Sequence, residues 1–302
     1  RGRCADSAGG CAAWPPPCEG CGGKHGHHLQ GIVHKAIYSK LGDKWKMSSL
    51  PETGKQTDVR VYIDQDTVNI LLDLSGLPLH KRGYRTDGGI APLRETTAAI
   101  LLQEMLWRRK TPLHDPFCGS GTIAIEATLY AFNVAPGFGR QFGIENLPIF
   151  NADRAKQIIQ EEAAKIRPDV EVRITGSDID PKAVARAKQN AEHACVMAGR
   201  ALHLIGKSSH IQRPDFIQAD FSSLQAPYPE GLLLCNPPYG ERLGTEEEAQ
   251  ELYSQMSNLK YDFPNWDIGV ITSAQNFESS FKHQTSSVKT IKAGNLDTKF
   301  YI

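Results

Sequence analysis

Long apolar runs are missing from this sequence of 302 residues, and the first 30 residues lack the apolar core of a signal peptide. A membrane-spanning helix needs about 18 or more apolar residues in a row, so we expect no membrane span and no membrane partner. Net charge is absent too, because 34 Lys and Arg residues balance 34 Asp and Glu residues. These absences favour a cytoplasmic globular protein, long enough for one α/β domain of roughly 190 to 220 residues and a smaller appendage.

The zero net charge hides a difference between two parts of the chain. Residues 1–112 contain 16 Lys and Arg against 11 Asp and Glu, a net charge of +5. Subtraction from the totals leaves 18 against 23, a net charge of −5, for residues 113–302. Basic surfaces attract the phosphates of nucleic acids, so the first part of the chain is the expected nucleic-acid face.

Cysteine is scarce beyond the start of the chain. Four of the seven cysteines lie in the first 21 residues with three histidines just after them: Cys4, Cys11, Cys18, Cys21, His25, His27 and His28. Zinc binding is one interpretation, although one of the two cysteine pairs lacks the usual ligand spacing. A disordered or foreign leader over residues 1–30 is the favoured alternative, because this segment is rich in Gly, Pro and Ala and has no apolar periodicity.

The sequence Asn-Pro-Pro-Tyr at residues 236–239 follows an apolar run. Methylation of an exocyclic base nitrogen needs acceptors for both amine protons, because the nitrogen lone pair is delocalised into the ring. The side-chain oxygen of Asn236 and the next backbone carbonyl, that of Pro237, can be these acceptors. The prolines stiffen the turn, and Tyr239 offers a ring on which an extruded base can stack. A plain Pro-rich turn after a buried strand is the alternative interpretation.

Residues 115–122 read Asp-Pro-Phe-Cys-Gly-Ser-Gly-Thr and precede a predicted helix. Gly119 and Gly121 allow the backbone to approach a ligand closely at a strand-to-helix turn, and the helix N-terminus presents free amides. Ala124 stands where a dinucleotide-binding loop has its third glycine, and no Lys-Ser/Thr pair follows. The pattern therefore indicates a cofactor loop of neither the dinucleotide nor the triphosphate kind.

Two further predicted strands are followed by acidic residues. Asp178 ends one of them, where a carboxylate can bind both hydroxyls of a ribose. Asp180 is better interpreted as the N-cap of the next helix. Asp220 ends the other strand and could accept from an adenine amino group, with Phe221 against the ring. This order of acids before residues 236–239 favours S-adenosylmethionine as the cofactor.

These motifs resemble those of the THUMP-associated class I RNA methyltransferases of bacteria. That group contains ribosomal RNA large-subunit guanine-N2 methyltransferases, and its members are often labelled as N6-adenine-specific DNA methylases. The resemblance runs from about residue 77 to residue 302, on the two motifs above and on residues 83–85, 91–96, 176–180 and 236–242. It implies an α/β fold with a Rossmann-like sheet that ends in an antiparallel hairpin.

The resemblance also implies roles for single residues. The cofactor is expected to be lined by Asp115, Phe117, Gly119, Asp178 and Asp220. The target base is expected to be held by Asn236, Pro237 and Tyr239.

The expected domains are the leader at residues 1–30, a remnant of a THUMP-like RNA-binding domain at residues 31–79, and the catalytic domain at residues 80–302. The remnant is predicted to contain a helix over 31–41 and a hairpin of strands 59–63 and 67–74. Basic residues gather where the catalytic domain begins, and we expect weak, salt-dependent RNA binding through Lys81, Arg82 and Arg85. A solvated linker is the alternative for this cluster.

Apolar periodicity predicts further elements of the catalytic domain. These are helices over 92–108, 182–193 and 245–258, strands over 172–178, 214–220, 231–235 and 266–272, and a terminal hairpin of strands 288–292 and 297–302.

The predicted function is methyl transfer from S-adenosylmethionine to guanine N2 in ribosomal RNA. The sulfonium is already activated, so we expect neither a metal nor a covalent intermediate, and no obligate protein partner is evident. An N6-adenine DNA methyltransferase is the main alternative. It would need a target-recognition domain of roughly a hundred residues, but 15 residues separate Asp220 from Asn236 and 63 follow Tyr239. A non-catalytic RNA-binding scaffold is the third possibility.

Overall fold

A computed structural model describes residues 24–49, 57–86, 92–239, 245–274, 276–293 and 296–302. The chain divides into two units, Arg1–Gln56 and Thr57–Ile302. The four leader cysteines, and with them the zinc interpretation, lie outside the described residues. In the first unit the structure describes one long helix, α1 (Lys24–Trp45), which extends beyond the predicted helix at both ends.

The second unit begins with the predicted hairpin of β1 (Val59–Asp64) and β2 (Thr67–Leu72). The strands pair antiparallel, with Asp64 opposite Thr67. Gln65 and Asp66 join them with φ of 43° and 65°, and positive φ at both turn residues gives a twist that suits a two-residue hairpin. The hairpin prediction is confirmed.

A seven-stranded sheet forms the centre of the second unit, in the order β5-β4-β3-β6-β7-β9-β8. The first five strands in this order are parallel, and β9 joins β7 and β8 antiparallel, as the class I methyltransferase fold requires. The strands are β3 (Leu113–Asp115), β4 (Ile174–Asp178), β5 (Asp215–Gln218), β6 (Gly231–Cys235), β7 (Trp266–Thr272), β8 (Val288–Ala293) and β9 (Leu296–Tyr301).

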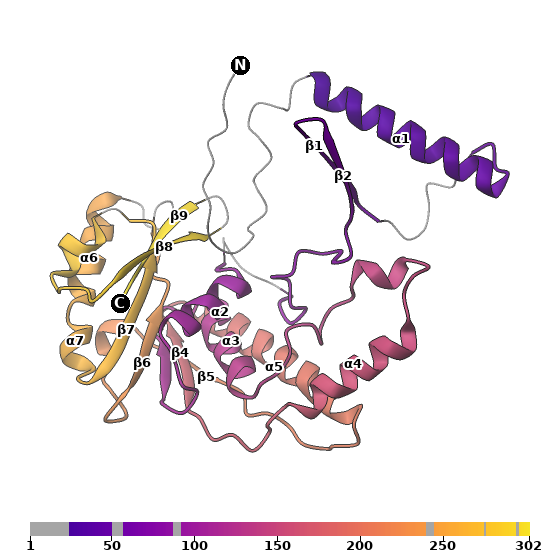
Figure 1. The fold of residues 1–302 in the computed structure, drawn as a ribbon. Coiled ribbons are helices and arrows are strands. Elements are labelled where there is room, and N and C mark those ends of the chain that lie inside the picture. The colour runs from indigo at the N-terminus through magenta and orange to yellow at the C-terminus, as the bar shows by residue number, and fades with distance from the viewer. Residues whose placement is uncertain (1–23, 50–56, 87–91, 240–244, 275, 294–295) are drawn as a thin grey trace. The chain divides into compact units, whose positions relative to one another are not determined.

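Helices cover both faces of the sheet (Figure 1). One face carries α2 (Glu95–Glu104), α3 (Thr122–Ala131) and α5 (Pro181–His203), with α4 (Ala152–Ala164) packed on α5. The other face carries α6 (Glu246–Met256), α7 (Leu259–Asp262) and α8 (Phe277–Phe281). Each set of helices contributes to its own cluster of buried side chains, so the sheet lies between two hydrophobic cores.

In the second unit, α5 and α2 differ from the predicted helices by four or more residues at one end. Helix α5 continues ten residues past His193, because Met197, Ala198 and other apolar residues extend its buried stripe. Helix α2 ends at Glu104, four residues early, and Leu106 shortly after it has φ of 50°, in the left-handed region that a helix cannot use. Among the described residues, no helix is long and apolar enough to cross a membrane.

Candidate active site

The sheet order brings the predicted site loops together. Strands β5, β4, β3 and β6 are consecutive neighbours, so their carboxyl ends meet at one edge. Asp115 and Asp178 are the last residues of β3 and β4, Asp220 lies two residues beyond β5, and Asn236 directly follows β6. After β3 the chain adds β4 and β5 on one side of β3 in the strand order, and it then crosses back to place β6 on the other side of β3. Ligands of open α/β sheets bind beside such a switch point.

Three neighbours hold the cofactor loop, residues 115–122. The backbone N–H of Gly119 donates to Asp178 Oδ2 at 2.9 Å, and that of Cys118 donates to the Ser177 carbonyl at 2.9 Å. Asn190, buried on α5, donates from Nδ2 to the Ser120 carbonyl at 3.1 Å. The loop is therefore fixed to β4 and α5 by contacts within the protein.

The two glycines of this loop have different surroundings, although both have left-handed backbone, with φ of 53° at Gly119 and 82° at Gly121. A Cβ at Gly121 would lie 2.9 Å from the Phe216 ring and 3.0 Å from Ala187 Cβ, so Gly121 is required by packing. A Cβ at Gly119 would meet nothing within 4 Å. Gly119 therefore faces open space in which a ligand can approach the backbone.

Asp178 and Asp180 have separate roles in the structure. Asp178 accepts through Oδ2 from Gly119 and through Oδ1 from the Asp180 N–H at 3.0 Å. A carboxylate has about four acceptor sites, so these bonds leave capacity for a ribose hydroxyl. Asp180 caps α5 by accepting from the Lys182 N–H at 2.8 Å, which confirms the predicted cap. Ribose binding by Asp178 stays a prediction.

Asp115 is a buried acid in the cofactor loop, with 1% of its surface exposed. Its Oδ1 accepts from the Phe117 N–H at 3.1 Å. Burial, together with repulsion from Asp178, raises the pKa of Asp115 to about 8. The carboxyl group is therefore mostly protonated at neutral pH and has an O–H that can donate to a ligand.

Two aromatic rings connect the loops after β3 and β5. Phe117 and Phe221 lie with ring centroids 4.9 Å apart. Asp220 is exposed, and its Oδ1 accepts from the N–H of Ser222 at 2.9 Å and from its hydroxyl at 2.8 Å, which caps the short helix η2 (Phe221–Ser223). The sequence pattern did not predict that Asp220 caps a short helix. Adenine recognition by Asp220 and Phe221 stays a prediction.

The residues 236–239, called the base clamp below, contain an unusual polar atom. Asn236 Oδ1 is buried and has no hydrogen-bond partner among the described residues. Leaving a buried polar atom unpaired costs about 1–3 kcal/mol, so such an atom in a native structure calls for a functional reason. Pro237 is buried, and Tyr239 is half-buried. The base clamp therefore presents an acceptor that a ligand can satisfy.

Sequence reasoning missed the residue that anchors this clamp. The fully buried Tyr253 of α6 donates its hydroxyl to the Pro238 carbonyl at 3.2 Å, and its oxygen lies 3.4 Å from Thr272 Oγ1 at the end of β7. The bond spans 15 residues, and nothing in the local pattern of α6 distinguishes Tyr253 from an ordinary core residue. A polar helix such as α6 predicts no particular buried contact for Tyr253, so the contact with the Pro238 carbonyl is visible only in the folded structure.

The predicted RNA-binding residues lie mainly in packing contacts. Arg82 Nη2 lies 3.4 Å from Glu126 Oε2, and Arg85 Nε lies 3.4 Å from Glu95 Oε1. The two arginine side chains are only 11% and 15% exposed, whereas Lys81 is exposed. Burial raises the pKa of Glu126 to about 7, and Arg82 opposes this shift. These ion pairs fasten the start of the catalytic domain to α2 and α3, and RNA binding by the three residues stays a prediction.

Arg85 also reaches the cofactor loop. Its Nη2 donates to Thr122 Oγ1 at 2.7 Å and to the Leu93 carbonyl at 3.0 Å. Thr122 is the first residue of α3, so Arg85 positions the helix that follows the loop.

Comparison with known proteins agrees with this geometry. Residues 82–302 match the family described as "RMKL-like, methyltransferase domain". "Putative RNA methyltransferase YpsC" of Bacillus subtilis (strain 168) is 37% identical over 278 residues, 90% of this chain and 68% of that protein. "Ribosomal RNA large subunit methyltransferase K/L" of Shewanella sp. (strain W3-18-1) is 36% identical over 275 residues, 89% of this chain and 37% of that protein.

A solved structure shows the same fold. It is the crystal structure of SMU.472, described as "a putative methyltransferase complexed with SAH", with a TM-score of 0.76 and 29% sequence identity over 90% of this chain and 69% of that one. The family match covers most of the chain and includes the whole carboxyl edge of the sheet described above. This protein therefore belongs to the RMKL-like methyltransferase domain family.

Proposed function

We propose that this protein transfers a methyl group from S-adenosylmethionine to an exocyclic amino group of an RNA base, with guanine N2 of ribosomal RNA as the target. The observation that carries the proposal is the buried Oδ1 of Asn236, which has no hydrogen-bond partner among the described residues. Asn236 lies directly after β6, the neighbour of the strand that leads into the cofactor loop. Such an acceptor suits an amine that must be held by hydrogen bonds and not merely enclosed.

The carboxyl edge of the sheet fits the cofactor. Gly119 gives open space at the backbone, Asp178 has acceptor capacity for ribose hydroxyls, and Asp115 has a protonated carboxyl group. When bound, S-adenosylmethionine supplies a methyl group already activated by its sulfonium. The task of the protein is then to place and orient the acceptor nitrogen.

The base clamp can perform this placement with two acceptors. Asn236 Oδ1 accepts from one amine proton, and the Pro237 carbonyl accepts from the other. The next carbonyl, that of Pro238, already accepts from the Tyr253 hydroxyl, which fixes the direction of the turn. Holding both protons draws the nitrogen toward a tetrahedral, nucleophilic shape. The Tyr239 ring stacks on the extruded base, a contact worth about 1–3 kcal/mol.

RNA as the substrate is supported by the names of the two relatives, one an RNA methyltransferase and one a ribosomal RNA methyltransferase. Guanine N2 rests on the resemblance carried by the motifs. Stacking of a single extruded base on Tyr239 suits a target taken from a loop or flipped out of a helix.

Methyl transfer from tritium-labelled S-adenosylmethionine to unmodified ribosomal RNA and to duplex DNA, followed by nucleoside analysis, tests the proposal. We expect label in RNA, recovered as N2-methylguanosine. Label recovered as N6-methyladenine in DNA, with none in RNA, would instead assign a DNA methyltransferase. Calorimetric binding of S-adenosylmethionine without transfer to either nucleic acid would favour a non-catalytic scaffold.

A further inference from the structure

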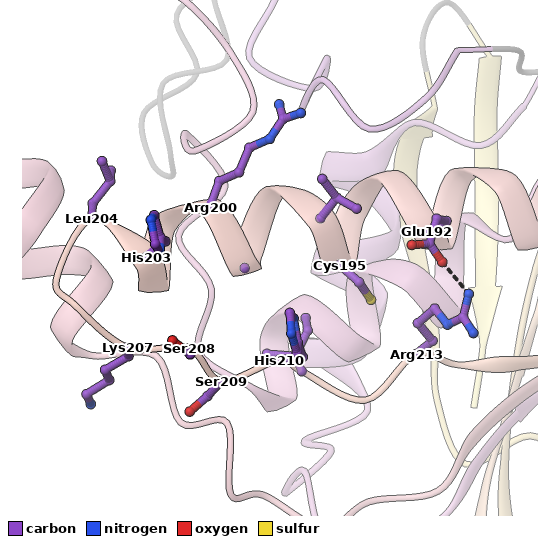
Figure 2. A pocket seen from close by; sticks show the side chains of 13 residues that line it. Glu192, Cys195, Arg200, His203, Leu204, Lys207, Ser208, Ser209, His210 and Arg213 are labelled. Atoms are coloured by element: carbon purple, nitrogen blue, oxygen red, sulfur yellow. Dashed lines mark hydrogen bonds and ion pairs between the residues drawn. The ribbon is translucent and has the colours of Figure 1, made fainter.

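A hollow lies along α5, away from the carboxyl edge of the sheet. It has a volume of about 810 Å³ and is lined by thirteen residues between Glu192 and Arg213, on the second half of α5 and on the segment that follows it. Figure 2 shows the helix as one wall and Lys207 to Arg213 running back beside it as the other. We call this hollow the α5 groove.

The α5 groove is separate from the cofactor site. Helix α5 starts at Pro181, just after the Asp178 turn, and runs away from the carboxyl edge. At 1.5 Å per residue, the groove covers the part of the helix from about 17 Å to about 35 Å beyond Pro181. A small ligand in the groove would therefore not reach the base clamp. A polymer of sufficient length could occupy both places.

Positive charge dominates the α5 groove. It contains Arg200, Lys207 and Arg213 against one carboxylate, Glu192, which pairs with Arg213 (Figure 2). The side chains of Arg200 and Lys207 are exposed and have no hydrogen-bond or ion-pair partner within the described part of the chain. The groove thus carries two uncompensated cations, in a part of the sequence, residues 113–302, whose net charge is −5.

The remaining lining includes hydroxyl groups, exposed apolar side chains and the two histidines His203 and His210. Ser208 and Ser209 contribute hydroxyls on the segment side, while Val196 and Leu204 are 41% and 58% exposed on the helix side. Phosphate oxygens accept from hydroxyls and from Arg or Lys, and the sugars between phosphates present apolar edges. A nucleic-acid backbone therefore matches the cations, the hydroxyls and the exposed apolar side chains of the lining, whereas a lone anion would use only the cations.

We propose that the α5 groove binds the phosphodiester backbone of the RNA substrate at nucleotides several positions away from the methylated base. The choice of RNA among nucleic acids rests on the proposed function. Arg200 and Lys207 each neutralise one phosphate, and the serine hydroxyls add hydrogen bonds without reading sequence. This surface lies outside the basic first third of the sequence, where the charge distribution alone places RNA binding.

The test uses two double variants with the same change in net charge. Arg200→Glu with Lys207→Glu removes the groove cations. Lys156→Glu with Lys260→Glu is the control, because both lysines are exposed and lie on α4 and α7, outside the groove. Binding of a fluorescein-labelled fragment of unmodified ribosomal RNA is followed by anisotropy between 50 and 200 mM salt. Calorimetry with S-adenosylmethionine verifies that each variant is folded.

We expect the groove variant to bind RNA at least tenfold more weakly than the wild type. We also expect the plot of log affinity against log salt to lose a slope of about 1.4 to 1.8, which is two phosphate contacts at 0.7 to 0.9 each. The control should stay within twofold to threefold of the wild type. Bound RNA should protect Lys207, but not Lys156, from chemical acetylation.

Equal affinities of the two variants, or no RNA binding by the wild type, would overturn the proposal. Groove-dependent binding of heparin or duplex DNA as tight as that of RNA would assign a general polyanion surface instead. If the wild type binds RNA through the groove but transfers no methyl group, the proposed function is contradicted and the groove proposal is supported. If the wild type methylates RNA and the groove variant binds RNA as tightly as the wild type, the groove proposal is contradicted and the proposed function is supported.

Discussion

The cofactor loop and the base clamp lie on adjacent strands, yet they are stabilised in different ways. The cofactor loop is held by hydrogen bonds from β4 and α5, and its glycine backbone is preformed. The base clamp is tethered by the Tyr253 hydroxyl at the Pro238 carbonyl, and its Asn236 Oδ1 is buried with no hydrogen-bond partner among the described residues. We infer that the cofactor loop is preformed before binding, and that the base of the proposed reaction would supply the hydrogen bond that Asn236 Oδ1 lacks among the described residues. Substitutions in the two loops should therefore separate binding from turnover.

The largest effect is expected for Asn236→Ala. Loss of an acceptor used in the transition state should lower the rate of methyl transfer about 100- to 1000-fold, with S-adenosylmethionine affinity within severalfold of the wild type. Because the variant loses a buried atom that has no hydrogen-bond partner in the described part of the chain, its free energy of unfolding should not fall as it would on loss of a satisfied hydrogen bond. Single-turnover kinetics, calorimetry and denaturant unfolding measure the three quantities.

Asn258→Ala is the matched control for this variant. Asn258 is exposed before α7, and its side chain makes no cap hydrogen bond. The Asn258→Ala protein should transfer methyl groups at the rate of the wild type. A near-normal rate of Asn236→Ala on any accepted RNA would remove Asn236 from its role and end the distinction between the two loops.

The second prediction concerns Asp115 in the cofactor loop. Its folded-state pKa is raised from 3.8 to about 8, so the folded protein holds a proton that the unfolded chain has lost between these values. Stability from this group is complete below pH 4 and is lost as the pH rises toward 8. Asp115→Asn mimics the protonated form, so its advantage in unfolding free energy over the wild type should grow by about 1.4 kcal/mol per pH unit, or about 3 kcal/mol from pH 5 to pH 7.

Urea unfolding of both proteins without cofactor at pH 5, 6 and 7 measures this slope. Asp169→Asn, an exposed position, serves as the control and should show no such trend. A difference between Asp115→Asn and wild type that is constant with pH would show that Asp115 is ionised in the folded protein.

The third prediction compares two acids at the end of β4. Asp178→Ala should weaken S-adenosylmethionine binding about 10- to 150-fold, because charge-assisted bonds to the ribose are worth about 1.5–3 kcal/mol. Asp180→Ala removes the cap of α5 and a partly exposed ion pair with Arg186, so it should lower the free energy of unfolding by about 1 kcal/mol and leave cofactor affinity within twofold. Calorimetry that finds unchanged affinity in a folded Asp178→Ala protein would contradict the ribose assignment.

The smallest effect is expected for Tyr253→Phe. The variant loses one hydroxyl that holds the clamp, so kcat should fall about threefold to tenfold while cofactor affinity stays the same. Tyr261→Phe is the control, because its ring is 73% exposed and contacts His283 away from the clamp. A matching loss of cofactor affinity in Tyr253→Phe would show a general structural role.

Sequence patterns predicted most of the sheet correctly, for a physical reason. Strands β6 and β7 have the predicted bounds because each is a short apolar run with a clear break at both ends. The cap role of Asp180 followed from local residue preference alone. By contrast, the burial of Arg82 depends on Glu126, 44 residues away, and the clamp tether depends on Tyr253. The fold brings such distant partners together, so the local sequence around Arg82 and Arg85 does not predict that their side chains are mostly buried.

The most direct test of the proposed reaction is nucleoside mass spectrometry on unmodified ribosomal RNA treated with wild-type protein or with Asn236→Ala, under conditions in which calorimetry shows S-adenosylmethionine bound to both. We predict N2-methylguanosine from the wild type and little or none from the variant. Equal yields from the two proteins, or a methylated adenine in DNA as the sole product, would contradict this prediction.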